Sequence, residues 1–279
     1  LESIPLLNTS SFEEIQTLIN NAMKLGIIND YGHDYINDFE KRFEIESRNP
    51  LSTGWKIIDK ICRGGLGKGE LGVVIAPTGV GKSMVLVHLG IQAILQAKTV
   101  VHYTLELQDV TVATRYDSCL TGIPLDDVFF KKEEIYEYIK DLKGQLIVKE
   151  YPTKTASTRT LRIHLEKLRQ RGILTDLIIV DYADLLKAVS KNSEKRHELE
   201  SIYEDLRAIA QEYKCPVWTA SQTNRSGQSE EVITMEQISE AYNKCFVADF
   251  IFSLSRTAEH KSTNTVSYTH LTLPTIYSV

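Results

Sequence analysis

The chain of 279 residues is 42% hydrophobic and carries a formal net charge of −5. This length and apolar content predict one large domain, alone or with a small appendage. The acidic balance argues against a uniformly basic nucleic-acid coat, but it is compatible with a basic channel on an acidic body. The four cysteines lack metal-ligand spacing, which indicates buried thiols in a reducing compartment. No signal peptide or transmembrane run is visible in the sequence, so we expect no membrane partner.

The first part of the chain has helical periodicity. Apolar residues recur at helical spacing in residues 12–25, and a second short helix is predicted at about residues 35–43. Pro50 and the Ser-Thr-Gly that follows shortly after it mark a boundary. We therefore expect residues 1–50 to form a helical linker or arm and residues 51–264 to form the main domain.

A glycine-rich loop follows the apolar run 71–75 and precedes a helical run. Strand, loop and helix in this order are typical of a phosphate-binding P-loop, because backbone N–H groups converge there on a polyphosphate. Lys82 is expected to reach the β- and γ-phosphates of ATP, and the Ser83 hydroxyl to ligate Mg²⁺. The usual first glycine is replaced by Ala76, which requires an ordinary φ at that residue. The predicted nucleotide-binding residues are Ala76, Pro77, Thr78, Gly79, Val80, Gly81, Lys82 and Ser83.

Two later apolar runs end in an acidic residue. The run 177–180 delivers Asp181, which is expected to support the metal beside Ser83. The run 100–105 delivers Glu106, which is expected to orient and deprotonate the attacking water. The ordinary alternatives are a turn residue for Asp181 and a surface residue that starts the next helix for Glu106. Asp184 is expected to cap a turn or contact solvent.

A further strand-like run, 216–220, continues into polar residues. Gln222 is expected to hydrogen-bond the γ-phosphate or the attacking water and to sense its loss. With Lys82 and Glu106 it completes the predicted catalytic group. Basic residues in the loop after Gln222 and in the segment after Asp181 predict a grip on the phosphate backbone of DNA, with a solvated charged surface as the alternative. The candidate DNA-binding residues are Lys187, Lys191, Lys195, Arg196 and Arg225.

Strand-like and helical stretches alternate throughout the main domain. The predicted strands are 71–76, 99–105, 145–149, 176–181, 216–220 and 249–254. The predicted helices are 83–96, 108–120, 132–142, 158–171, 194–213 and 235–241. Strands that are apolar throughout predict an α/β fold whose mostly parallel sheet is flanked by helices on both faces, with ligands at the carboxyl ends of the strands.

The composition changes near the end of the chain. From about Thr265 the sequence is rich in Thr and Ser and has no charged Lys, Arg, Asp or Glu. We expect residues 265–279 to be a non-native tail similar to translated adapter sequence, and the alternative is a final edge strand.

In this order and spacing, the motifs resemble the RecA-like ATPase domain of DnaB-family replicative helicases, most closely the phage and viral members, over about residues 50–256. The lead-in at 52–59, Thr104-Leu105-Glu106, the strand 179–182 and the Ser-Gln-Thr-Asn-Arg segment 221–225 carry the resemblance. The glutamate strand of that family is catalytic, its Asp strand is Walker B, and its Ser-Gln-x-Asn-Arg segment is a sensor.

The resemblance implies an ATP-dependent DNA helicase that forms a ring, usually a homo-hexamer, with ATP and Mg²⁺ between subunits. Single-stranded DNA would occupy the channel, with movement from 5′ to 3′, and a primase or helicase loader is an implied partner. The helix at 12–25 resembles the linker helix that docks on an adjacent subunit. The implied location is the cytoplasm of a bacterial or archaeal host, with a phage as one origin. The family's arginine finger follows the last core strand, and Arg256 is not assigned to it.

Two other interpretations share the same core. A RecA- or RadA-like recombinase would form filaments and exchange strands, whereas a non-translocating ATPase switch or assembly protein would need only nucleotide-dependent oligomerisation. The segment 221–225 and the helical linker favour the helicase, and Glu106 argues against a module that binds ATP without hydrolysing it.

Overall fold

The computed structural model describes residues 32, 34–40, 48–189, 195–223, 247–256, 260 and 265–270. The chain divides into two compact units, Leu1–Arg48 and Asn49–Val279, close to the predicted boundary. In the first unit, residues 34–40 form turns in which Asp34 Oδ1 accepts from the backbone N–H groups of Ile36 (3.0 Å) and Asn37 (2.9 Å). The remainder of the helix predicted at 35–43, and all of that at 12–25, lie outside the described residues.

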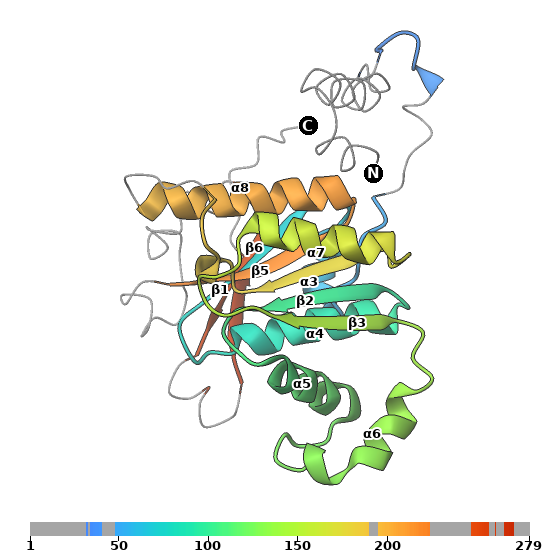
Figure 1. The fold of residues 1–279 in the computed structure, drawn as a ribbon, viewed down its shortest axis with the longest axis vertical. Coiled ribbons are helices and arrows are strands. Elements are labelled where there is room, and N and C mark those ends of the chain that lie inside the picture. Colours follow the sequence, from blue (N-terminus) through green and yellow to red (C-terminus); the bar gives the residue numbers. More distant parts are fainter. Residues whose placement is uncertain are drawn as a thin grey trace, which may run out of the picture. The chain divides into compact units, whose positions relative to one another are not determined.

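The second unit contains a seven-stranded sheet with the strand order β3-β2-β4-β5-β1-β6-β7 (Figure 1). Its strands are β1 (Leu71–Ala76), β2 (Thr99–Thr104), β3 (Gln145–Glu150), β4 (Leu177–Asp181), β5 (Val217–Gln222), β6 (Phe250–Ser255) and β7 (Ser267–His270). All neighbouring pairs are parallel except β6 and β7, which are antiparallel. The predicted α/β fold with a mostly parallel sheet is confirmed.

The helices of this unit follow the predicted alternation. Among the described residues they are α3 (Lys56–Ile61), α4 (Lys82–Leu95), α5 (Asp109–Thr121), α6 (Lys132–Ile139), α7 (Thr158–Gln170) and α8 (Lys195–Tyr213), with short 3-10 turns η2 (Val128–Phe130) and η3 (Ala183–Leu185). The short helix α3 was not predicted, and the helix predicted at 235–241 lies outside the described residues. None of the helices in the described part of the chain combines the length and hydrophobicity needed to span a bilayer.

Two hydrophobic cores lie on the two faces of the sheet. Helices α7 and α8 cover one face, and α4 and α5 cover the other (Figure 1). Alternate residues of β1 serve both cores: Val73 and Ile75 belong to the α7/α8 core, and Val74 and Ala76 to the α4 core. Every residue of β1, β4 and β6 is buried, which explains why the sequences of these strands are largely apolar.

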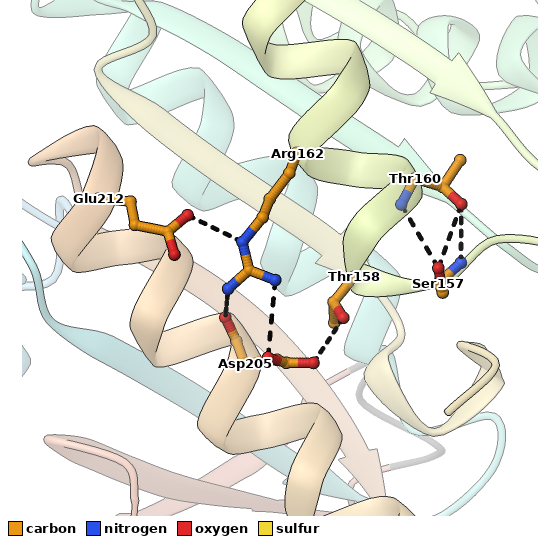
Figure 2. A network of polar contacts seen from close by, with 6 residues as sticks. All are labelled: Ser157, Thr158, Thr160, Arg162, Asp205 and Glu212. Atoms are coloured by element: carbon orange, nitrogen blue, oxygen red, sulfur yellow. Dashed lines mark hydrogen bonds and ion pairs between the residues drawn. The ribbon is translucent and has the colours of Figure 1, made fainter. Parts of the chain in front are cut away.

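A polar network joins α7 to α8 above the first face (Figure 2). Arg162 of α7 donates from Nε to Glu212 Oε2 at 2.8 Å and lies 3.6 Å from Asp205 Oδ1. The second oxygen of Asp205 accepts from the Thr158 hydroxyl at 2.6 Å. At the start of α7, a capping box satisfies the first free N–H groups of the helix. The network therefore fixes the orientation of α7 on its neighbour.

The segment after Thr265 contributes the last strand of the sheet. Residues 267–270 pair with β6, and the His270 ring stacks on Phe250 with centroids 4.9 Å apart. This pairing corresponds to the edge-strand alternative for the segment. The non-native origin of residues 265–279 stays a prediction, and residues 271–279 lie outside the described part.

Helices α4 and α5 approach each other closely at a glycine. A Cβ added to Gly90 of α4 would collide with the hydroxyl of Tyr116 in α5. That hydroxyl is hydrogen-bonded to Nδ1 of His102, in β2, at 3.0 Å. Burial and, to a smaller extent, the charge of Arg115 lower the pKa of the fully enclosed His102 to about 3, so the imidazole stays neutral. Gly90 thus preserves a buried hydrogen bond.

Gly90→Ala is expected to lower the free energy of unfolding by about 1–3 kcal/mol, because overpacking forces buried groups apart. Alanine ordinarily stabilises a helix interior by about 1 kcal/mol relative to glycine, so a loss of stability points to the collision with Tyr116. Urea unfolding of both single variants and the double variant with Tyr116→Phe provides the measurement. Because the phenylalanine lacks the hydroxyl, the alanine should cost less in that background. An equal cost in both backgrounds contradicts the explanation.

Candidate nucleotide-binding and hydrolysis site

The predicted site residues come from four neighbouring strands. In the order β2-β4-β5-β1 these strands run parallel, so their carboxyl ends lie along one edge of the sheet. The register aligns Thr104 with Asp181 and Ala76 with Gln222. Glu106 lies two residues after the end of β2, Asp181 ends β4, Gln222 ends β5, and the glycine-rich loop follows β1.

The loop has the backbone geometry of an anion-binding turn before a helix. Gly79 and Gly81 have φ of +78° and +112°, a region that side chains with a Cβ disfavour. Gly81 is the N-cap of α4, which begins at Lys82. Ala76 belongs to β1 and is absent from the described non-glycine residues of positive φ, so the condition for an alanine at this position is met. The first N–H groups of α4 therefore lie beside the loop, where an anion is favoured.

The Lys82 side chain is held across the loop. Its Nζ donates to the backbone oxygens of Ala76 at 3.2 Å and Pro77 at 3.3 Å, and only 8% of the residue is exposed. Burial lowers the pKa of the Lys82 ammonium, whereas the charges of Glu106 and Asp181 raise it. The ammonium is thus partly desolvated and surrounded by acids, which suits a lysine that binds phosphate.

Asp181 is a buried carboxylate without a hydrogen-bond partner of normal geometry among the described residues. Burial raises its pKa, and the Ser83 hydroxyl opposes this from nearby, although that hydroxyl does not reach good hydrogen-bonding geometry. Glu106 raises the pKa further, and Arg115 and Lys82 lower it. Two open carboxylate oxygens beside a hydroxyl fit the oxygen preference of Mg²⁺.

No cluster of three or more His, Cys, Asp or Glu side chains suited to a metal occurs among the described residues. A cation at Asp181 and Ser83 would therefore need further oxygens from phosphate and water, which is how Mg²⁺ ordinarily binds in nucleotide sites.

Glu106 lies in a bend at the end of β2, and its side chain is exposed. The bend is closed by the Thr104 hydroxyl, which accepts from the Leu107 N–H at 3.1 Å and donates to the Leu107 oxygen at 2.7 Å. The Leu105 N–H donates to the backbone oxygen of Asp181 at 2.8 Å, which ties the bend to β4. The charge of Glu106 raises the pKa of both Lys82 and Asp181, so its carboxylate lies within electrostatic reach of both groups.

Gln222 connects the end of β5 to the P-loop. Its Nε2 donates to the Thr78 hydroxyl at 2.8 Å, and the following Thr223 N–H lies 3.4 Å from the Ala76 oxygen. The amide of Gln222 therefore already lies beside the loop that would bind the phosphates.

Asp184 has a role that the sequence did not reveal. It was expected to cap a turn or contact solvent, but its carboxylate accepts hydrogen bonds from Tyr203, Ser221 and the backbone of Gln222. These partners come from α8 and β5, far along the chain, and no local pattern marks them. Arg115 of α5 was also missed, although its charge acts on Asp181.

The candidate DNA-binding residues are only partly described. Lys187 is exposed, and its backbone N–H donates to the Ala156 oxygen at 2.8 Å. Lys195 and Arg196 begin α8, but their side chains lie outside the described part, as do Lys191 and Arg225 altogether. Their grouping on one face stays a prediction.

Asp181→Asn is expected to stabilise the protein at pH 8 by about 1 kcal/mol. Burial raises the pKa of Asp181 above its ordinary value of 3.8, so the folded chain holds this proton more tightly than the unfolded chain. The carboxyl therefore lowers the stability as the pH rises from about 4 through its folded pKa, and the whole cost is present above that range. Asparagine does not ionise and removes this dependence. Urea unfolding of both proteins at pH 5 and pH 8, without nucleotide or magnesium, checks this. A variant that is less stable than the unchanged protein at pH 8 contradicts the assignment.

Comparisons with known proteins agree with this architecture. The family model for the DnaB-like helicase C-terminal domain matches residues 50–269. The DnaB-like replicative helicase of Enterobacteria phage T4 is 29% identical over 259 residues, which cover 88% of this chain and 54% of that protein. The replicative DNA helicase DnaB of Helicobacter pylori (strain ATCC 700392 / 26695) is 23% identical over 233 residues, which cover 81% of this chain and 45% of that protein. The chain thus spans about half the length of these relatives.

Two solved structures share the fold. One of them, an ATPase domain, aligns with a TM-score of 0.66 and 16% identity over 81% of this chain and 82% of that chain. A DnaB-like replicative helicase, solved in a study of its interactions with primase, aligns with a TM-score of 0.70 and 15% identity over 94% of this chain and 64% of that chain. Because the family model covers most of the chain, including every strand that contributes to the site, the chain belongs to the family of DnaB-like helicase C-terminal domains.

Proposed function

We propose that this chain is the ATPase motor of a replicative DNA helicase, which hydrolyses ATP at subunit interfaces to move along single-stranded DNA and unwind duplex. The observation that carries the proposal is the meeting of the P-loop, Glu106, Asp181 and Gln222 at the ends of four adjacent parallel strands. Ligands of open α/β sheets bind at this edge. Membership of the helicase family supports DNA unwinding as the work done with the ATP.

Each residue at the edge has a proposed part in hydrolysis. The loop 76–83 and the Lys82 ammonium bind the phosphates of ATP, and Ser83 and Asp181 would hold Mg²⁺, whose charge offsets that of the phosphates. Glu106 takes the proton of the attacking water, for which its exposed carboxylate within electrostatic reach of Lys82 is suited. The Gln222 amide donates to the γ-phosphate or to the attacking water. It loses this hydrogen bond when that group leaves, and in this way it senses hydrolysis.

The partners are also proposals. We infer a homo-hexameric ring around single-stranded DNA that moves from 5′ to 3′ in the cytoplasm of a bacterial or archaeal host. A primase or helicase loader is a further proposed partner, supported by the structural neighbour that was studied for its interactions with primase. Unwinding of a forked DNA substrate, with no homologous third strand present, separates this function from a recombinase, which needs such a strand for exchange, and from a non-translocating switch, which does not separate strands.

Glu106→Gln is expected to leave ATP binding unchanged and to lower turnover by roughly a hundredfold or more, the usual effect of a lost general base. The amide keeps the size of the side chain but cannot accept the proton. Turnover is measured by phosphate release, and binding by the fluorescence of a labelled ATP analogue. Glu133→Gln is the matched control, because Glu133 is an exposed carboxylate in the first turn of α6, away from the four strand ends. Normal turnover in the Glu106 variant would show that another group is the base.

Replacing both Lys191 and Lys195 with alanine is expected to weaken single-strand binding equally on all sequences, because contacts to phosphate carry no base information. On single-stranded DNA, each lost phosphate contact should reduce the steepness of the plot of log binding constant against log salt concentration by about 0.7. ATP turnover without DNA should change little, whereas its stimulation by DNA should fall. Affinity is measured at several salt concentrations, with the oligomeric state checked by light scattering. Unchanged affinity and salt dependence in an assembled variant would remove these residues from the DNA path.

A further inference from the structure

The Asp184 carboxylate joins two elements at the base of the site. One oxygen, Oδ1, accepts from the Tyr203 hydroxyl of α8 at 2.9 Å. The other, Oδ2, accepts from the Ser221 hydroxyl at 3.1 Å and from the Gln222 N–H at 3.4 Å. The end of β5 that carries Gln222 is therefore attached to the turn that follows β4.

The backbone of the same turn is attached on its other side. The Lys154 ammonium donates to the backbone oxygens of Asp184 at 2.6 Å and Leu186 at 2.9 Å. One residue later, the Lys187 N–H donates to the Ala156 oxygen at 2.8 Å. The short segment 184–187 is thus held between β5 and residues 154–156, and it leads directly towards the candidate DNA-binding residues.

Gln222 is hydrogen-bonded through both its backbone and its side chain. Its backbone N–H reaches Asp184, and its side-chain amide donates to Thr78 of the P-loop. A γ-phosphate bound by the loop would compete for that amide, because it is a stronger acceptor than a hydroxyl. Movement of the Gln222 side chain towards the phosphate would shift the strand end to which Asp184 is bonded.

We propose that Asp184 is a positioning residue that couples the place of Gln222 at the nucleotide to the segment 184–187 and so to DNA affinity. The inference rests on the proposed function, since it requires that the chain bind both ATP and single-stranded DNA. Asp184 touches neither ligand in this scheme. It acts by transmitting a displacement between two elements that its carboxylate joins.

The test measures how strongly nucleotide changes DNA affinity. The dissociation constant of the full chain for a labelled oligo-dT is determined with and without a non-hydrolysable ATP analogue and magnesium, and the ratio of the two constants measures the coupling. Couplings of this kind commonly change affinity by about fivefold or more. Asp184→Asn keeps the shape of the side chain but loses its charge and one hydrogen-bond acceptor. It is expected to bring the ratio of the two DNA dissociation constants at least about fivefold closer to 1. Affinity for the analogue without DNA should stay within about twofold, because Asp184 does not contact nucleotide.

Asp205→Asn is the matched control. Asp205 is also a carboxylate that accepts from a hydroxyl, but its partners join α7 to α8 and not to the site (Figure 2). The Asp205→Asn variant should have a lower melting temperature but the same ratio of DNA dissociation constants as the unchanged chain. Ser221→Ala, which removes one bond to Asp184, should shift the ratio in the same direction as Asp184→Asn and serves if that variant does not fold.

The outcomes are distinct. An Asp184→Asn protein that is less stable but keeps the unchanged ratio has lost only a structural bond, and the coupling role is then wrong. Asp205→Asn and Asp184→Asn reducing the ratio equally would also overturn it. An unchanged chain that binds no ATP analogue or no DNA contradicts the proposed function itself, and the coupling with it.

Discussion

The burial of the central strands on both faces is the constraint on which the rest of this structure depends. With α7 and α8 on one side and α4 and α5 on the other, β1 and β4 have no face left for water. A charged side chain in the middle of such a strand would be desolvated without compensation. Charged side chains on these strands are therefore confined to the strand ends. Because the strands are parallel, the carboxyl ends meet at one edge and place their side chains together.

Placing the site at that edge has an energetic cost. Burial disfavours the charged form of both Lys82 and Asp181, lowering the pKa of the lysine and raising that of the acid. Their opposite charges offset part of this cost, and Arg115 contributes on the side of Asp181. Two carboxylate oxygens still have no hydrogen bond among the described residues. Buried polar groups are ordinarily hydrogen-bonded, and the proposed Mg²⁺ ion would account for these two oxygens.

Much of the fold could be predicted because the burial of each strand and helix determines the local pattern of apolar and polar residues. Strands buried on both faces are largely apolar, which placed β1, β4 and β6 within about a residue of their observed bounds. Glu106, Asp181 and Gln222 could be assigned to one edge for the same reason, since each directly follows or ends such a run. The short helix α3 has too few residues to show a period and was missed.

Contacts between distant segments could not be predicted from local pattern. The bonds of Asp184 depend on Tyr203 and Ser221, which are brought to it only by the completed sheet. The close approach of Gly90 to Tyr116 likewise exists only once α4 and α5 have packed. From the sequence alone, Gly90 is only a weak helix former. No nearby residue indicates that its missing side chain makes room for the Tyr116 hydroxyl.

The order of the strands also affects how the chain is made. Strand β1 lies between β5 and β6, both of which are synthesised much later, so its two edges stay open while the intervening helices and strands emerge. Contacts between such distant segments form slowly, because a long loop must close before they gain any stability. During that interval the apolar β1 and the P-loop attached to it have no sheet partner. An incomplete chain that ends before β5 would therefore present an unpaired hydrophobic strand, with the aggregation risk that such edges carry.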